Sequence, residues 1–169
     1  MPSFERAAWI KHVLDKQDAP DFDGYLAEHF HEDAYRMTKM NAAKTDDVKA
    51  RILHVDDDPD IRLMIAASLR EFGYVVATAG TNAEALELTK QFKFDLFILD
   101  VRLPDGSGIE LCQEIHEVQP NVPVLYYSAY ASDEEQEEAL SVCGDAYLKK
   151  PVSASKLKQT IAKLLKSKH

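Results

Sequence analysis

The stretch FDLFILDVRLPDGSG, residues 94–108, decides the fold of this chain. Bulky apolar side chains fill successive positions before Asp100, a pattern typical of a strand that is buried on both faces, as in a parallel sheet. A loop that contains Pro104, Gly106 and Gly108 follows at once. Open α/β sheets bind ligands at the carboxyl ends of their strands, so Asp100 is a candidate functional residue. From this stretch alone, capping of the next helix is an equally good role for Asp100.

Strands and helices alternate on both sides of this stretch. We expect strands at residues 52–55, 74–78, 95–99, 124–127 and 146–148. We expect helices from Pro59 to about Gly73, and at residues 82–92, 108–118, 133–142 and 153–166. Alternation with short connections predicts an α/β fold, with a five-stranded parallel sheet that is doubly wound by helices on both faces. In the first of these helices, Ile61, Met64, Ile65 and Leu69 are expected to point inward.

Residues 1–49 lack the alternation of strand and helix patterns that the rest of the chain shows. Two short amphipathic helices are expected there, separated by a break at Pro20 and Gly24 and followed by a polar linker. Two helices of this length cannot build a core of their own. The sequence therefore divides into a helical N-terminal extension with its linker, residues 1–49, and a main domain, residues 50–169.

Composition excludes several classes of protein. The net charge of −9 and the pI of about 5.1 argue against a nucleic-acid-binding protein, which shows a basic patch on a basic domain. No apolar run is long enough to span a membrane, and no signal peptide is apparent, so we expect a cytoplasmic protein. Cys112 and Cys143 fall in helical patterns beside apolar residues, and we interpret both as small buried apolar residues in a reducing compartment. A zinc site needs more ligands at closer spacing than these two provide.

Polar residues follow four of the expected strands. Asp56 and Asp57 follow the first, Asp100 the third, Ser128 the fourth and Lys150 the fifth. In a parallel sheet these ends share one edge, where carboxylates about 4 Å apart repel by roughly 4 kcal/mol at an effective dielectric of about 20. A cation makes such a cluster tolerable, and ligands that are all oxygen atoms favour Mg²⁺.

This set of side chains suffices to accept a phosphoryl group. A carboxylate beside Mg²⁺ can attack phosphorus and form an aspartyl phosphate, while a lysine and a hydroxyl stabilise charge on the phosphoryl oxygens. The set contains no histidine, and the chain has neither a glycine-rich nucleotide-binding loop nor a Walker lysine motif. The chain therefore does not look like a kinase in its own right.

The sequence resembles the response regulator receiver domain of two-component signalling. The matching stretches, in order, are ILHVDDDPDIR, FDLFILDVRLPDGSGIEL, PVLYYSAYA and AYLKKPV. The resemblance covers about residues 51–166 and implies a flavodoxin-like sheet with the strand order 2-1-3-4-5. It also suggests a receiver that stands alone, since no effector domain follows the last helix of this sequence.

The resemblance assigns a metal site and a phosphoacceptor. It implies that Asp57 binds Mg²⁺ directly, that Asp56 acts through water, and that Asp100 is both the phosphoacceptor and a ligand. The main-chain carbonyl of Arg102 is implied as a further ligand. Asp58 lies outside the usual acid pair, and we expect it to cap the helix that Pro59 opens.

The resemblance also assigns a switch. Ser128 is the implied switch hydroxyl, Tyr147 the aromatic switch residue, and Lys150, rather than Lys149, the lysine of the site. Phosphorylation is expected to draw Ser128 inward and to let Tyr147 fill the space, which changes the face formed by the fourth helix, fifth strand and fifth helix.

The implied partners are a histidine kinase or phosphotransfer protein as donor and a downstream protein, with no nucleic acid and no membrane. Acidic side chains on the fourth helix and lysines on the fifth are either two solvated faces or the two halves of a homodimer surface. Two other functions stay open: a Mg²⁺-dependent phosphohydrolase with an aspartyl nucleophile, and a scaffold that works without phosphorylation. The hydrolase is disfavoured because Arg102 stands where such enzymes carry a second aspartate, and we expect a protein that is not an enzyme.

Overall fold

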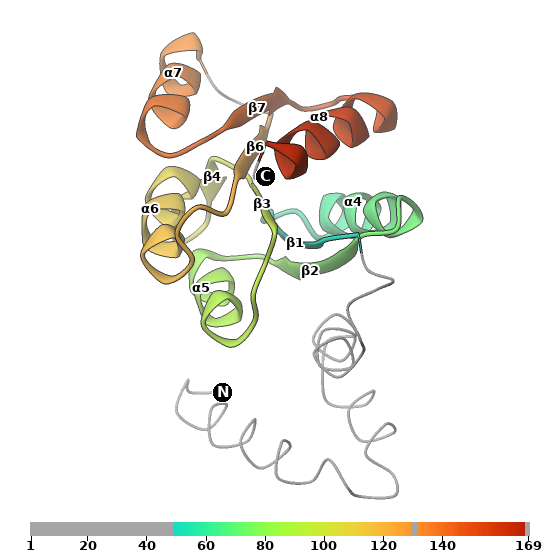
Figure 1. Ribbon diagram of the computed structural model, residues 1–169. Helices are drawn as coiled ribbons and strands as arrows, with labels where there is room; N and C mark the ends of the chain where they lie inside the picture. The colour runs from blue at the N-terminus through green and yellow to red at the C-terminus, as the bar shows by residue number, and fades with distance from the viewer. Residues whose placement is uncertain (1–48, 130–131, 168–169) are drawn as a thin grey trace, which may run out of the picture.

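A five-stranded parallel sheet forms the centre of the molecule (Figure 1). The computed structural model describes residues 49–129 and 132–167, and the two helices expected near the N-terminus lie outside them. The strands are β1 (Arg51–Val55), β2 (Val75–Ala79), β3 (Leu96–Leu99), β6 (Val124–Ser128) and β7 (Ala146–Lys149). They are arranged in the order β2-β1-β3-β6-β7, so the predicted strand order is confirmed.

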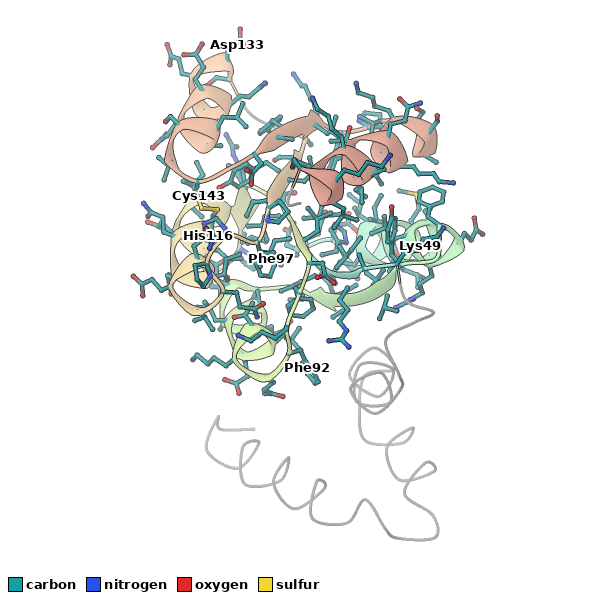
Figure 2. The ribbon with its side chains drawn as sticks, viewed as in Figure 1. Lys49, Phe92, Phe97, His116, Asp133 and Cys143 are labelled. Atoms are coloured by element: carbon teal, nitrogen blue, oxygen red, sulfur yellow. A yellow bond between two sulfur atoms is a disulfide. The ribbon has the colours of Figure 1, made fainter. Side chains whose placement is uncertain are left out.

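Helices cover both faces of the sheet (Figure 1). They are α4 (Pro59–Glu71), α5 (Asn82–Gln91), α6 (Gly108–Val118), α7 (Asp133–Val142) and α8 (Ala154–Lys166). One apolar core lies between the sheet and α5, α6 and α7, and a second lies between the sheet and α4 and α8. Phe97 of β3 sits deep in the first core, whereas Asp133 opens α7 at the molecular surface (Figure 2). This two-sided burial explains why β3 carries apolar residues at successive positions.

Side-chain caps fix where the helices begin. Asp58 accepts hydrogen bonds from the backbone N–H groups of Asp60 and Ile61, so its expected capping role is confirmed. Ser107 and Ser132 each form a reciprocal capping box, with Glu110 and Glu135 respectively. The cap residue Ser107 lies only seven positions after Asp100, so the loop between Asp100 and α6 is short.

The loop after β3 contains a small antiparallel pair that the sequence did not predict. Its strands are β4 (Arg102–Leu103) and β5 (Gly106–Ser107). Asp105, at the turn between them, accepts hydrogen bonds from the backbone N–H groups of Asn82 and Ala83 at the start of α5. The loop that carries Asp100 is thereby tied to a neighbouring helix.

Two predictions about side chains are wrong. Met64 is 57% exposed, because one residue, or about 100° of helix rotation, separates it from the buried Ile65. Cys112 and Cys143 are not free thiols but form a disulfide between α6 and the end of α7. Their Cα atoms are 6.1 Å apart, within the range that a disulfide spans. The 31-residue separation in sequence concealed this proximity.

Among the described residues, no helix combines the length and the apolar character that crossing a membrane requires.

Candidate functional site

Three carboxylates meet at the carboxyl edge of the sheet. Asp56 and Asp57 follow β1, and Asp100 follows β3, the neighbour of β1 in the sheet. Their ligand oxygens all lie within 4.8 Å of one another. Asp56 and Asp100 are buried, whereas Asp57 is exposed. The structure thus brings together the three acids that the sequence placed at strand ends, with one of them open to solvent.

Lys150 joins two of these carboxylates. It follows β7, and its Nζ lies 2.6 Å from Asp100 Oδ2 and 2.5 Å from Asp56 Oδ2. The ammonium also lies 5.3 Å from the centre of the Tyr127 ring. Lys149, the alternative in the sequence, is exposed. Lys150, the first residue after β7, therefore points into the site, whereas Lys149, the last residue of the strand, is exposed.

The other oxygen of Asp100 accepts two hydrogen bonds. The Ser128 hydroxyl donates to Asp100 Oδ1 at 2.6 Å, and the Arg102 backbone N–H donates to the same atom at 3.2 Å. Ser128 is 1% exposed, so its hydroxyl is held against the carboxylate without competition from bulk solvent. Both oxygens of Asp100 thus have fixed partners, and the orientation of this carboxylate is set by its neighbours.

The electrostatics of the site favour bound positive charge. Burial raises the pKa of Asp56, and the hydrogen bond from Lys150 only partly opposes this. Burial acts to lower the pKa of Lys150, but its hydrogen bonds to Asp100 and Asp56 outweigh that effect and raise the pKa. A cation beside Asp56 would relieve the cost of its buried charge.

Sequence reasoning missed two residues beside the acids. The Arg62 guanidinium, on α4, donates to the backbone carbonyls of Asp56 and Asp57, which fixes the loop that carries them. His54, on β1, lies with its Nε2 3.7 Å from Asp56 Oδ2. Burial, followed by the charge of Lys150, lowers the pKa of His54 to about 3, so its ring is neutral. Arg62 follows Asp56 by six positions and lies about one turn into α4. This spacing was the only sign in the sequence that Arg62 could reach back to the loop after β1.

The expected switch residues lie on neighbouring strands, Ser128 at the end of β6 and Tyr147 in β7. Tyr147 packs against Tyr126, with ring centres 6.4 Å apart, and its hydroxyl is buried. Burial raises the pKa of this phenol. Arg102 directs its side chain outward, where it is 63% exposed and lies 3.3 Å from Glu135 of α7. The loop after Asp100 is therefore linked directly to the first turn of α7.

A sequence model described as the response regulator receiver domain matches residues 52–162, about two thirds of the chain. The chain belongs to this family. Receiver domains are the signalling modules of two-component response regulators, and the fold and the acidic cluster at the sheet edge agree with this assignment.

Response regulators from several bacteria are similar in sequence. The transcriptional regulatory protein ZraR of Escherichia coli is 40% identical over 118 residues, which cover 70% of this chain and 27% of ZraR. The response regulator protein PilR of Pseudomonas aeruginosa is 36% identical over 118 residues, which cover 70% of this chain and 26% of PilR. The chain thus matches only about a quarter of the length of these relatives.

Solved receiver structures share the fold. A CheY-like receiver domain protein from Methanospirillum hungatei is 35% identical, with a TM-score of 0.67, and the match covers 70% of this chain and 94% of that protein. The chemotaxis protein CheY4 of Vibrio cholerae is 31% identical with a TM-score of 0.65, and the match covers 68% of this chain and 98% of CheY4. The match takes in nearly the whole of these two receivers.

Proposed function

We propose that this receiver domain, residues 50–169, accepts a phosphoryl group on Asp100 from the phosphohistidine of a histidine kinase or phosphotransfer protein. The observation that carries the proposal is the position of Asp100, which lies within 4.8 Å of the ligand oxygens of Asp56 and Asp57 and 2.6 Å from Lys150. Membership of the receiver family supports the same assignment. Residues 1–49 are, in this proposal, a separate extension.

The donor set fits Mg²⁺. Asp56, Asp57 and Asp100 offer oxygen atoms only, and the main-chain carbonyl of Arg102 is proposed as a further ligand. The raised pKa of Asp56 is consistent with a site whose buried charge calls for a cation. When bound, Mg²⁺ would offset negative charge on the phosphoryl oxygens.

The residues of the chain supply the rest of the chemistry. A carboxylate oxygen of Asp100 attacks phosphorus, and the phosphorus–nitrogen bond of the donor breaks. The Ser128 hydroxyl and the Lys150 ammonium, which now contact Asp100, turn to the incoming phosphoryl oxygens. The product is an aspartyl phosphate whose added charge is held by the same two side chains.

The signal passes on through Ser128 and Tyr147. Ser128 ends β6 and Tyr147 lies in the neighbouring β7, and Glu135 of α7 contacts Arg102 beside the site. Added charge at Asp100 favours one packing of Ser128 and Tyr147 over another, which is a shift between two populations. A downstream protein reads the resulting change on α7, β7 and α8. The contact of Tyr147 with Tyr126 and that of Arg102 with Glu135 support this route.

Two other functions make different predictions. A phosphohydrolase would release phosphate repeatedly, but Arg102 occupies the acid/base position and its side chain turns outward to Glu135. A scaffold that works without phosphorylation would not need the buried contacts of Asp100 with Ser128 and Lys150. Incubation with a small acyl phosphate separates all three: one phosphoryl group per chain, continuous release of phosphate, or no reaction.

Beryllofluoride, a phosphoryl analogue, tests the assignment of Asp100. In the presence of Mg²⁺ we expect the amide resonances of Ser128 and Tyr147 to shift in the nuclear magnetic resonance spectrum of the wild type. Asp100→Asn should abolish the shift, whereas Glu117→Gln, an exposed change on α6, should leave it intact. An unchanged wild-type spectrum, or a full response in Asp100→Asn, would refute the proposal.

A further inference from the structure

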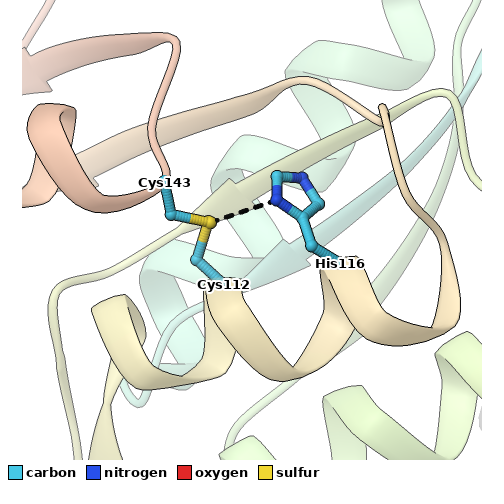
Figure 3. Close-up of side chains that lie close together, drawn as sticks. All are labelled: Cys112, His116 and Cys143. Carbon is cyan, nitrogen blue, oxygen red and sulfur yellow. Dashed lines mark hydrogen bonds between the residues drawn. A yellow bond between two sulfur atoms is a disulfide. The ribbon is translucent and has the colours of Figure 1, made fainter.

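A second cluster of metal-ligand side chains lies between α6 and the end of α7. Cys112 and His116 are one helical turn apart on α6, and Cys143 caps the end of α7 (Figure 3). His116 Nδ1 lies 3.2 Å from Cys143 Sγ, which is bonded to Cys112 Sγ. Cys112 is buried, while His116 and Cys143 are half-buried. None of the three residues belongs to the acidic site.

The hydrogen bonds of His116 determine which ring nitrogen carries a proton. Its Nε2 lies 2.8 Å from the Val122 carbonyl oxygen, which can only accept, so Nε2 must be the donor. In the neutral ring Nδ1 then bears a lone pair, and it points at Cys143 Sγ. A disulfide sulfur has no proton to offer that lone pair. At metal sites, a ligating histidine usually binds the metal through one ring nitrogen and donates the N–H of the other to a carbonyl or carboxylate.

We propose that Cys112, His116 and Cys143 form a Zn²⁺ site once their disulfide is reduced. Two thiolates and one imidazole are a donor set that favours zinc. With bonds of about 2.3 Å to sulfur and about 2.0 Å to nitrogen, a tetrahedral site separates its ligand atoms by roughly 3.5 to 3.8 Å. The three ligand atoms already lie within 4.8 Å of one another, so only the two bonded sulfurs have to move apart.

A pocket beside the cluster leaves room for a fourth ligand. Its volume is about 330 Å³, and His116, Val122, Cys143 and Asp145 are among the residues that line it. Three protein ligands with one open position are typical of zinc sites that also bind water. Water can enter this pocket, and the Asp145 carboxylate, which accepts from the Val124 N–H, is present in its wall.

The change from disulfide to zinc site takes place in two steps, reduction and metal binding. A dithiol gives two electrons and two protons to the disulfide and becomes a disulfide itself, while Cys112 and Cys143 become thiols. Zn²⁺ then displaces one proton from each thiol into water, and the His116 Nδ1 lone pair binds without any proton transfer. The metal thus replaces the disulfide as the link between α6 and the end of α7.

Cobalt titration of the full-length chain tests this site. After reduction with a phosphine in the absence of oxygen, Co²⁺ should bind with sulfur-to-cobalt charge-transfer absorption, and Zn²⁺ should displace it. The oxidised protein should show no such band. Cys112→Ser should abolish it, and His116→Ala should weaken Co²⁺ binding at least tenfold, as loss of a metal contact does elsewhere.

Two features keep this result interpretable. The chain has only two cysteines, so a thiolate band in the reduced wild type can only come from Cys112 and Cys143. Asp57→Ala should keep the band, because the acidic site offers oxygen ligands alone. The absence of the band in reduced wild-type protein would overturn the proposal, as would a His116→Ala variant that binds Co²⁺ as tightly as wild type.

Discussion

The ammonium of Lys150 lies 2.6 Å from a carboxylate oxygen of Asp100, although 50 positions separate the two residues. The same ammonium contacts Asp56, so one side chain that follows β7 offsets the charges of acids that follow β1 and β3. All three groups are largely removed from solvent, with side-chain exposures of 10% or less. The fold therefore holds two carboxylates together through a single cation before any metal binds.

Lys150→Met should destabilise the metal-free protein by about 3 kcal/mol at neutral pH, because it leaves two buried carboxylates without this partner. Urea unfolding measures the change. Lys149→Met, at the exposed neighbouring position, should change stability by less than about 0.5 kcal/mol. Mg²⁺ should restore part of the loss, since it binds the folded state. Equal stabilities for the two variants would contradict this account of the site.

Gly108→Ala should disturb the site through the backbone. A Cβ at Gly108 would overlap the carbonyl oxygen of Asp100 and crowd Val101 Cα, and neither backbone group can move away alone. We expect a loss of about 1–3 kcal/mol, the usual cost of overpacking, together with weaker beryllofluoride binding.

Gln113→Ala is the control for this change on the same helix. Gln113 is exposed on α6, so its replacement should change stability by less than about 0.5 kcal/mol and leave beryllofluoride binding intact. Thermal unfolding and beryllofluoride titration of both variants make the comparison. If Gln113→Ala proved as damaging as Gly108→Ala, close approach of α6 to Asp100 would not be what constrains this loop.

Much of the fold and of the acidic site could be predicted because both follow from strand ends. Apolar runs marked the strands, and the shared edge of a parallel sheet then brought Asp56, Asp57 and Asp100 together. The choice of Lys150 over Lys149 rested on the family resemblance, and the structure places Lys150 against Asp100. The common direction of the strands thus predicts the cluster of acids, and the family resemblance predicts the lysine.

The remaining features depend on contacts between elements, which no local pattern encodes. The Cys112–Cys143 disulfide forms because the end of α7 lies against α6, and periodicity within either helix does not reveal this. His116, one turn after Cys112, joins them for the same reason. Likewise, the hydrogen bonds of Arg62 to the loop after β1 depend on the angle at which α4 leaves that loop.

Asp56→Asn should make the metal-free protein more stable at neutral pH. Burial raises the pKa of Asp56 above 3.8, so the folded state binds this proton more tightly than the unfolded state does. The contribution of Asp56 to stability therefore falls as pH rises from 3.8 through the raised value. The advantage of Asp56→Asn should vanish below pH 3.8 and be full above the raised pKa of Asp56. Urea unfolding across this pH range gives the measurement.

Asp105→Asn should show the opposite dependence. Partial burial acts to raise the pKa of Asp105, but hydrogen bonds from the backbone N–H groups of Asn82 and Ala83 outweigh it and lower the pKa. Its contribution to stability is present above pH 3.8 and is lost as pH falls through the lowered value. Asp105→Asn should therefore weaken the protein at neutral pH and converge with wild type in acid. A shared sign for the two variants would show that these local environments do not control stability.

Homodimer formation through α7 and α8 should depend on salt. Exposed acids on α7 include Asp133, Glu134, Glu137 and Glu138, and exposed lysines on α8 include Lys156, Lys163 and Lys166. Lys158 instead lies over the Phe72 ring, 4.8 Å from its centre, and so faces α4. Two copies that pair α7 with α8 would attract, and screening lengths fall from about 10 Å at 0.1 M salt to about 3 Å at 1 M.

Sedimentation equilibrium with beryllofluoride and Mg²⁺ measures this association. We expect it to weaken as salt rises, and Glu137→Lys should weaken it at low salt because the new charge repels the lysines of α8. Glu114→Lys, an exposed change of the same charge on α6, should leave it unaltered. If neither salt nor Glu137→Lys changed the association constant, the charged sides of α7 and α8 would simply face solvent. Any dimer would then form through another surface.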